Sequence, residues 1–389
     1  MSERDKGGRD AVKALILVFV SLLFVFVILE LTLRMTHLFG AATSFTRPDP
    51  VIGNSFVPGA SYWQHSENDR PITGRINSHG WRDREWSIKP ADDTQRVAVI
   101  GDSFVEAFQV EEEKTFLSIA EKELRRKGRK VELMNFGRSG FTQTEELVVL
   151  RRQVARFSPD VVMLFYLPLN DIGDVSPETA SNTLRPFFGA SGERLVLDTS
   201  YTDSKVYKLK SAILPIKSNS ALAALVIKRV DALLYGEQAL SESVAYDVGD
   251  STISKIEGYE SLATKMPEAE YRESYELTKR LIAEMIEFSE SRSIRFVLVT
   301  IDTPSHVPAV EKAYARVEPS YDYRFFEDDM DDFASSKGID HIGLQSVFRS
   351  AYVKNDQKLH WEHWNYQGHR LVASEIVKYL QQTSLAGEQ

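Results

Sequence analysis

Short apolar runs rich in β-branched residues alternate along this chain with longer stretches whose apolar residues recur at helical spacing. Because two parallel strands need a long crossover between them, such alternation favours an α/β fold with a mainly parallel sheet and helices on both faces, a three-layer α/β/α arrangement. The predicted strands lie near 97–101, 131–135, 161–166, 295–301 and 340–342, and the predicted helices near 114–127, 143–157, 271–292 and 366–381.

A serine follows the first of these strands at once. Residues 96–106 read Arg-Val-Ala-Val-Ile-Gly-Asp-Ser-Phe-Val-Glu, so the apolar run stops at Gly101 and is followed by Asp102 and Ser103. Ligands of parallel α/β sheets bind beyond the carboxyl ends of the strands. A helix that begins at this turn also directs its free N–H groups toward that place. Ser103 is therefore a candidate nucleophile, and the alternative is that Asp102 and Ser103 only cap the helix.

Three further segments carry polar residues in similar positions. The second predicted strand leads through Asn-Phe-Gly-Arg-Ser to Gly140, the third ends at Asn170, and His363 stands just before the last predicted helix. A serine hydroxyl needs a base to take its proton, and a histidine with a pKa near neutrality suits that task. Attack on an ester carbonyl also builds negative charge on oxygen, which hydrogen-bond donors must stabilise.

With these residues the chain resembles the SGNH hydrolases, also called the GDSL esterase and lipase family. Ser103, Gly140, Asn170 and His363 match in order the serine, glycine, asparagine and histidine of the family's blocks, and the resemblance covers roughly residues 96–175 and 290–382. It implies a flavodoxin-like fold in which Ser103 is the nucleophile and His363 the base. It also implies an oxyanion hole made of the backbone N–H groups of Ser103 and Gly140 and the side-chain amide of Asn170.

One departure from the family concerns the third block, which usually reads Gly-x-Asn-Asp. Pro168 holds the glycine position here. We expect this change to be tolerated if the loop is otherwise rigid, because the donor is Asn170.

A second departure concerns the acid that orients the histidine. The family's aspartate lies two or three residues before the histidine, and those positions hold Trp361 and His360. Glu362 and Asp356 are candidate substitutes; the other possibility is a dyad in which a backbone carbonyl orients His363. We favour the dyad, because the Glu362 side chain is expected to diverge from its neighbour.

The same region also allows a metal interpretation. His360, His363 and His369 form a cluster of the kind that zinc sites use. No Asp- or Cys-rich partner segment stands out, and Gly368-His369 fits the helix start that the family shows. We therefore expect no metal and no cofactor, with His369 structural and His360 a polar residue satisfied by a neighbour.

The N-terminal region contains an apolar run at residues 14–33, bracketed by Lys13 and Arg34, with Glu30 near one end. Twenty helical residues rise about 30 Å, the thickness of a bilayer core. The main alternative is a signal peptide cleaved near 40–42. The run is long for a signal peptide, so we favour an uncleaved transmembrane anchor.

Charge predicts the orientation of this anchor. Only Arg34 and Arg47 follow the run within a stretch of similar length, whereas four basic residues precede it: Arg4, Lys6, Arg9 and Lys13. The positive-inside rule then places the N-terminus in the cytoplasm and the bulk of the chain outside it, in the periplasm or outside the cell of a bacterium.

Composition excludes two classes of function. The chain has 389 residues, a net charge of −9 and no cysteine. It shows no basic stripe interleaved with aromatic residues, so we do not expect nucleic acid as a partner. Without cysteine there is neither disulfide nor thiol chemistry.

The chain divides into three predicted parts: a cytoplasmic tip and anchor at 1–37, a linking segment with turn signals at 38–95, and a catalytic domain at 96–389. Within the last part the alternation breaks at about 174–269. This insertion holds an apolar helical stretch at 211–234 and a polar stretch at 241–256 that we expect to be mobile. The apolar stretch is interpreted as a lid over Ser103 or as a core helix of the insertion.

These features predict a membrane-anchored serine esterase, or an O-acyl-transferring enzyme, that works through an acyl-serine. Resemblance to anchored family members suggests a cell-envelope carbohydrate ester, such as an acetylated polysaccharide, as substrate. The alternative is a non-catalytic envelope protein that keeps the fold to bind glycan or protein partners. The missing aspartate supports that alternative, and the four intact block residues argue against it.

Overall fold

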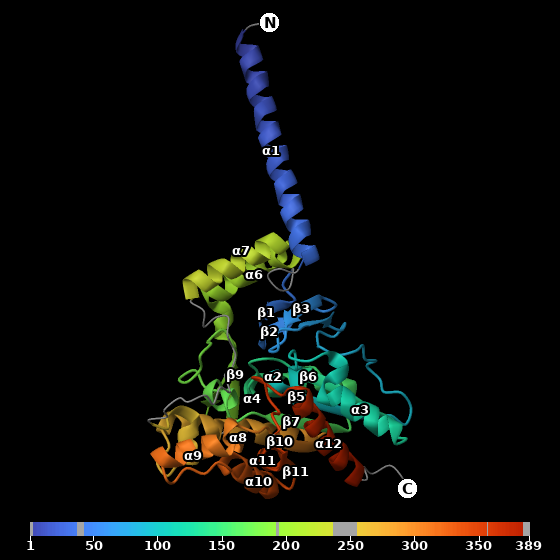
Figure 1. Ribbon diagram of the computed structural model, residues 1–389, viewed down its shortest axis with the longest axis vertical. Coiled ribbons are helices and arrows are strands. Elements are labelled where there is room, and N and C mark those ends of the chain that lie inside the picture. Colours follow the sequence, from blue (N-terminus) through green and yellow to red (C-terminus); the bar gives the residue numbers. More distant parts are fainter. Residues whose placement is uncertain (1–2, 37–42, 192–193, 236–254, 356, 384–389) are drawn as a thin grey trace. The chain divides into compact units, whose positions relative to one another are not determined.

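The computed structural model describes residues 3–36, 43–191, 194–235, 255–355 and 357–383 (Figure 1). The chain forms two compact units: Met1–Phe45 with Leu209–Glu242, and Thr46–Lys208 with Ser243–Gln389. The alternative cleavage region at 40–42 and nearly all of the polar stretch at 241–256 lie outside the described residues.

The second unit is built around a five-stranded sheet in which every neighbouring pair is parallel. Its strands lie in the order β11-β10-β7-β5-β6. Numbered one to five along the chain, they have the flavodoxin-like order 2-1-3-4-5, which confirms the predicted fold class. The bounds are β5 Gln95–Gly101, β6 Val131–Gly137, β7 Val161–Tyr166, β10 Arg295–Thr300 and β11 Asp340–Gly343.

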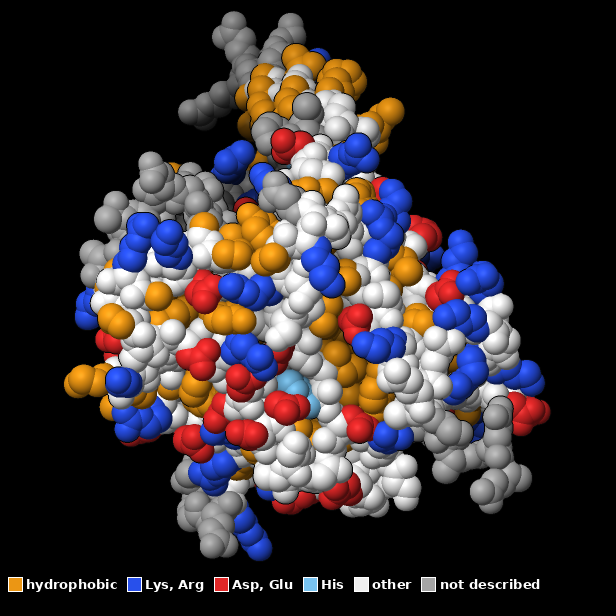
Figure 2. Space-filling view, turned by 60° about the horizontal axis from the view of Figure 1, so that its bottom comes forward, with side chains coloured by type: hydrophobic (Ala, Val, Ile, Leu, Met, Phe, Trp, Pro, Cys, Tyr) orange, Lys and Arg blue, Asp and Glu red, His pale blue; other side chains and the backbone are white. Residues whose placement is uncertain are grey.

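Helices cover both faces of this sheet, which makes three layers (Figure 1). One face is covered by α4 (Gln143–Arg152), α8 (Ala269–Glu290) and α10 (Phe325–Lys337). The other is covered by α3 (Phe116–Arg126), α11 (Gln345–Asn355) and α12 (Tyr366–Gln382). Over most of the surface shown in Figure 2, Lys and Arg side chains are interspersed with Asp and Glu side chains, as is usual for surface in contact with water.

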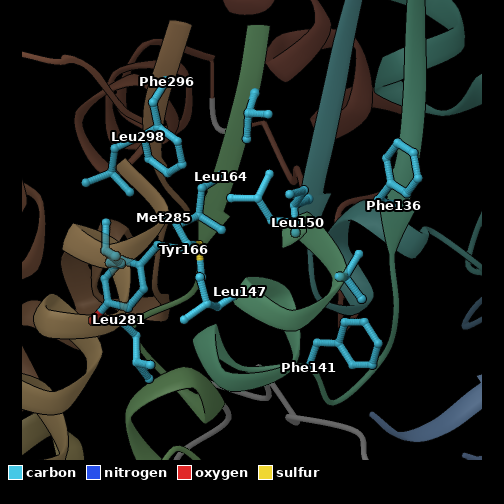
Figure 3. Packing of buried hydrophobic residues seen from close by; sticks show 14 of the residues in the cluster. Phe136, Phe141, Leu147, Leu150, Leu164, Tyr166, Leu281, Met285, Phe296 and Leu298 are labelled. Atoms are coloured by element: carbon cyan, nitrogen blue, oxygen red, sulfur yellow. The ribbon is translucent and has the colours of Figure 1, made fainter. Parts of the chain in front are cut away.

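The core between the sheet and its helices is apolar because the central strands are buried on both sides. In Figure 3 side chains of α4 (Leu147 and Leu150) and of α8 (Leu281 and Met285) point toward β7. The labelled side chains of β7 itself are Leu164 and Tyr166. Each fully buried side chain of this kind contributes roughly 1.5–3 kcal/mol relative to exposure. This packing holds the carboxyl ends of the strands in fixed positions.

The predicted strands and helices of the sheet region are confirmed to within a few residues. The helix expected at 143–157 is shorter: α4 ends at Arg152, and a 3-10 turn, Val154–Phe157, continues it. Three helices were not predicted from periodicity: α9 (Pro308–Val317), α10 and α11. The insertion holds a β-hairpin of β8 (Phe187–Ser191) and β9 (Arg194–Asp198).

The segment expected to be a link, 38–95, belongs from Thr46 onward to the compact unit of the sheet. It forms two antiparallel hairpins, β1 (Thr46–Asp49) with β2 (Gly53–Phe56) and β3 (Ser61–His65) with β4 (Pro71–Arg75). Of the turn signals there, Pro48-Asp49-Pro50 leads into the turn between the paired strands β1 and β2.

The first unit contains α1 (Glu3–Thr36), in which Ala11–Thr36 is long and apolar enough to cross a membrane. The segment 211–234, which was predicted to contain an apolar helical stretch, holds most of α6 (Lys205–Asn219) and nearly all of α7 (Ala221–Tyr235), separated at Ser220. Most of α6 and all of α7 cluster with α1.

Candidate active site

Ser103 opens a short helix, α2 (Ser103–Glu106), directly after β5. The side chain of Asp102 accepts a hydrogen bond from Phe104 N at 3.0 Å, so the capping interpretation is correct for Asp102. Ser103 has a different partner, because its Oγ lies 2.8 Å from His363 Nε2. Gly101 permits the tight turn: a Cβ there would lie 2.5 Å from the Val105 side chain. The partly exposed hydroxyl of Ser103 therefore stands at the strand order's switch point, beside a base.

The other ring nitrogen of His363 has a carboxylate partner from much earlier in the chain. Glu67 Oε1 lies 2.5 Å from His363 Nδ1. Glu67 Oε2 accepts hydrogen bonds from the backbone N–H groups of Glu362 and His363, both at 2.9 Å. Because both carboxylate oxygens are held, Glu67 fixes the ring's orientation and keeps the proton on Nδ1. Nε2 is then without a proton and faces Ser103 Oγ as an acceptor.

A hairpin tip carries Glu67. The turn between β3 and β4 is closed by a hydrogen bond from Ser66 N to Arg70 O at 2.7 Å. The hairpin is tied to the region of Ser103 through Arg82, whose buried guanidinium donates to Tyr62 of β3 at 3.1 Å. The same guanidinium donates to three backbone carbonyls at and after the end of α2, those of Glu106, Ala107 and Val110. Arg82 thus sets the position of the hairpin relative to the strand that presents Ser103.

The expectation of a dyad is wrong for this chain. Glu362 gives a backbone N–H to Glu67 and is not the carboxylate on His363 Nδ1. Asp356 lies outside the described residues. The sequence signal at Glu67 is a hairpin tip, Ser-Glu-Asn-Asp between two extended runs, and it does not indicate which histidine the tip approaches.

Electrostatics favour a charged Glu67 and a basic His363. Burial raises the pKa of Glu67, but the hydrogen bonds and charge of His363 outweigh it, so the pKa lies below its usual 4.5. Burial lowers the pKa of His363, but the hydrogen bond and charge of Glu67 outweigh it, so the pKa lies above 6.5. The N-terminus of α12 disfavours a positive charge on His363, and the carboxylate of Glu67 opposes that effect.

Gly140 follows β6 with φ +76°, a backbone conformation that favours glycine. The loop before it is held to α2 by Glu106, which pairs with Arg138 Nη1 at 2.7 Å and accepts a hydrogen bond from Ser139 Oγ. Glu106 and Arg138 are both buried, so this contact is shielded from solvent. The loop of Gly140 is therefore fixed relative to the helix that Ser103 begins.

Arg185, from the insertion, joins the segments of Gly140 and Asn170. Its Nη2 donates to Gly140 O at 2.7 Å, and its guanidinium pairs with Glu145 of α4 at 2.8 Å. Its Nη1 lies 3.2 Å from Asp174, just after the helix that Asn170 begins. Arg185 thus ties the Gly140 loop to the Asn170 segment.

Asn170 begins α5 (Asn170–Gly173), after the loop that contains Pro168. That loop is rigid as required, because buried Asp171 accepts hydrogen bonds from Leu167 N at 2.8 Å and from Gln143 Nε2 at 2.7 Å.

Asn170→Ala is expected to lower kcat for an ester by about 10²–10³, the usual cost of one oxyanion donor, with little change in KM. The reason is that the amide binds charge that develops only in the transition state. Steady-state kinetics on an aryl acetate measure this, and unchanged far-UV circular dichroism serves as the folding control. A rise in KM at constant kcat would instead assign Asn170 to substrate binding.

The other two histidines of the cluster, His360 and His369, contact neighbours other than Ser103 and Glu67. His369 is buried and bonded at both ring nitrogens, to Phe116 N and to the Gln109 amide, each at 3.2 Å. Burial, with the charge of Arg82 second, lowers its pKa to about 3. The expectation of a structural His369 is confirmed.

His360 Nε2 lies 3.2 Å from Oδ2 of buried Asp302, which is an ion-pair distance. Asp302, His306 and His360 offer ligand atoms within 4.8 Å of one another and are the group that could hold a metal in the described chain. His306 Nδ1 lies 2.8 Å from the carbonyl oxygen of Thr303 and 2.9 Å from Asp302. Asp302 also accepts a hydrogen bond from Trp364 Nε1 at 3.0 Å, which ties the group to the histidine loop.

The predicted order is thus observed: β5, β6 and β7 are followed by Ser103, Gly140 and Asn170. The helix α12 is preceded by His363. This order is the one expected from the resemblance to the SGNH hydrolases. No protein-family model matches the chain, and no curated protein matches it. Solved structures do.

Three of the solved structures to which this chain is similar are the following. An acetyl xylan esterase is 15% identical, with 73% of this chain and 99% of that chain covered and a TM-score of 0.41. A lipolytic protein of the G-D-S-L family from Veillonella parvula is 10% identical, with 74% and 100% covered and a TM-score of 0.39. A two-domain esterase active on acetylated mannans is 11% identical, with 74% and 49% covered and a TM-score of 0.38.

Proposed function

We propose that this protein is a serine esterase, or an O-acyl-transferring enzyme, that acts on ester bonds through an acyl-serine intermediate. The observation that carries the proposal is the hydrogen-bonded series Ser103–His363–Glu67, with distances of 2.8 Å and 2.5 Å. A nucleophile, a base and an acid that orients the base are the three groups that acyl transfer by serine requires.

In the proposed mechanism, Ser103 Oγ attacks the ester carbonyl carbon while His363 Nε2 takes its proton. The oxyanion is bound by the N–H groups of Ser103 and Gly140 and by the Asn170 amide. His363 then returns the proton to the leaving alcohol as the C–O bond breaks, which leaves the acyl-serine. A second acceptor, activated by the same histidine, releases the acyl group: water makes the protein a hydrolase, and a sugar hydroxyl makes it a transferase.

We further propose that residues 1–37 form a cytoplasmic tip and a single-pass anchor, and that the catalytic unit lies outside the cytoplasm. The apolar helix Ala11–Thr36 and the basic residues before it support this topology. In a bacterium this position gives access to the cell envelope. Together with the resemblance to anchored SGNH proteins, it supports acylated envelope carbohydrates as the substrate class.

The non-catalytic alternative loses its main support. It rested on the absent aspartate of the last block, and Glu67 occupies the corresponding place on His363 Nδ1. A binding module has no need for a carboxylate held at both oxygens behind a histidine that faces a serine.

The test of the proposal is acetate release by the purified full-length protein in detergent. Substrates would be an aryl acetate and acetylated polysaccharides, with and without an unacetylated sugar acceptor. We expect turnover of the aryl acetate and a preference for one class of acetylated glycan. Acetyl groups recovered on the added sugar would identify a transferase. Absence of turnover above the buffer rate on every substrate would refute the enzymatic proposal.

A further inference from the structure

The junction between α6 and α7 is bonded to the outer end of α1. Glu30 of α1 accepts hydrogen bonds from the backbone N–H groups of Ala221 and Leu222, at 2.7 Å and 3.0 Å, and from Ser220 Oγ at 3.0 Å. Arg34, one turn further along α1, donates to Asn219 O at 2.7 Å. A carboxylate at a helix N-terminus satisfies N–H groups that have no partner within the helix. The start of α7 is therefore held at the level of residues 30–34 of α1.

This level corresponds to a depth in the bilayer. The apolar helix Ala11–Thr36 has its midpoint next to Phe24. Glu30 is about 10 Å from that midpoint and Arg34 about 16 Å, at 1.5 Å per residue. The hydrocarbon core extends about 15 Å on either side of its centre. The contacts at the beginning of α7 thus lie about 10–16 Å from the midpoint, from just inside the hydrocarbon core to its boundary with the headgroups.

The two helices present apolar side chains to their surroundings. On α7 the exposed residues Val226, Val230 and Leu233 are spaced by four and three, so they share one helix face. On α6 the exposed residues Leu209 and Ile216 are seven apart and likewise share a face. An apolar stripe on a helix at this depth is suited to acyl chains.

The charge of the segment differs from that of the whole chain. Residues 209–235 contain four basic residues, Lys210, Lys217, Lys228 and Arg229, and a single acidic one, Asp231, whereas the chain carries a net charge of −9. Basic residues beside an apolar stripe are attracted to anionic headgroups by about 1 kcal/mol each.

We propose that the segment from Leu209 to Tyr235, here called the interfacial pair, lies in the headgroup region of an anionic bilayer with its apolar stripes among the acyl chains. This gives the protein a second membrane contact besides α1, on the same leaflet as the catalytic unit. The inference rests on α1 spanning the membrane, and it goes beyond the proposed chemistry because it concerns no residue of the active site.

The chain's lack of cysteine allows a direct test by site-directed spin labelling. Single cysteines at Val226, Val230 and Ile216 would be labelled in the full-length protein, reconstituted in vesicles of phosphatidylglycerol and phosphatidylethanolamine. Accessibility to oxygen, which concentrates in lipid, would be compared with accessibility to a water-soluble nickel chelate. Matched controls are Val353→Cys, an exposed apolar position on α11, and Lys228→Cys on α7.

We expect oxygen to reach Val226, Val230 and Ile216 more readily than nickel, and the reverse order at Val353. Lys228 should lie between them. Nickel accessibility at the three test positions equal to that at Val353 would overturn the proposal. So would labels that are immobile and reached by neither reagent, because protein would then cover the stripes. A label at Phe24 tests separately whether α1 spans the membrane. Nickel access at Phe24 would refute that span, whatever the result for the interfacial pair.

Discussion

Ser103→Ala is expected to lower kcat for an aryl acetate by about 10⁶-fold, the loss seen when the nucleophile of a serine triad is removed. The reason is that the acyl-serine no longer forms, while the donors at Gly140 and Asn170 still bind the oxyanion of a slow attack by water. The same variant should not react with a fluorophosphonate probe, which in the unchanged protein should label one serine. Labelled peptides identified by mass spectrometry measure this directly.

Ser118→Ala is the matched control, because Ser118 is also half-buried and lies on α3, where its Oγ accepts a hydrogen bond from Thr115 at 3.2 Å. It should keep full activity and full labelling. If Ser103→Ala reacted with the probe as fast as the unchanged protein, another serine would be the nucleophile and the catalytic assignment would be lost.

Glu67→Gln is expected to lower kcat by about 10⁴-fold, the effect of amidating the acid of a serine triad. A glutamine amide at this place donates to His363 Nδ1, which moves the ring proton to Nε2. That nitrogen then faces Ser103 Oγ with a proton and does not accept another. Glu362→Gln is the control: its side chain is not the partner of Nδ1, so its effect should be less than about tenfold.

Glu67→Gln also has a signature in the pH profile. His363 acts as a base only when neutral, so activity rises with pH through its pKa. Since Glu67 raises that pKa above 6.5, the acidic limb of kcat/KM should lie above pH 6.5 in the unchanged protein. In Glu67→Gln the limb should move to lower pH although the maximal rate falls. A limb that stays in place would show that Glu67 does not interact with the base.

Much of the fold follows from local pattern. Strands such as Val161–Tyr166 are buried on both faces and therefore read as continuous apolar runs, which periodicity identifies. The helices α9, α10 and α11 are harder to recognise, because α10, for instance, carries many acidic residues and buries only a narrow stripe. The β1–β4 hairpins are similarly obscured by short strands with mixed burial.

For the candidate site, the sequence by itself determined the residues that follow the sheet's strands: Ser103, Gly140 and Asn170, with His363 before the last helix. Their places depend on local turns, and parallel strands bring those turns to one edge of the sheet. Only the tertiary structure decided the acid. Along the chain, Glu67 and His363 are separated by almost the whole sheet domain. The approach of Glu67 to His363 depends on buried Arg82, which joins the hairpin to the carbonyls at the end of α2. A contact between such distant segments leaves no local pattern, because it is set by packing and not by the spacing of residues along the chain.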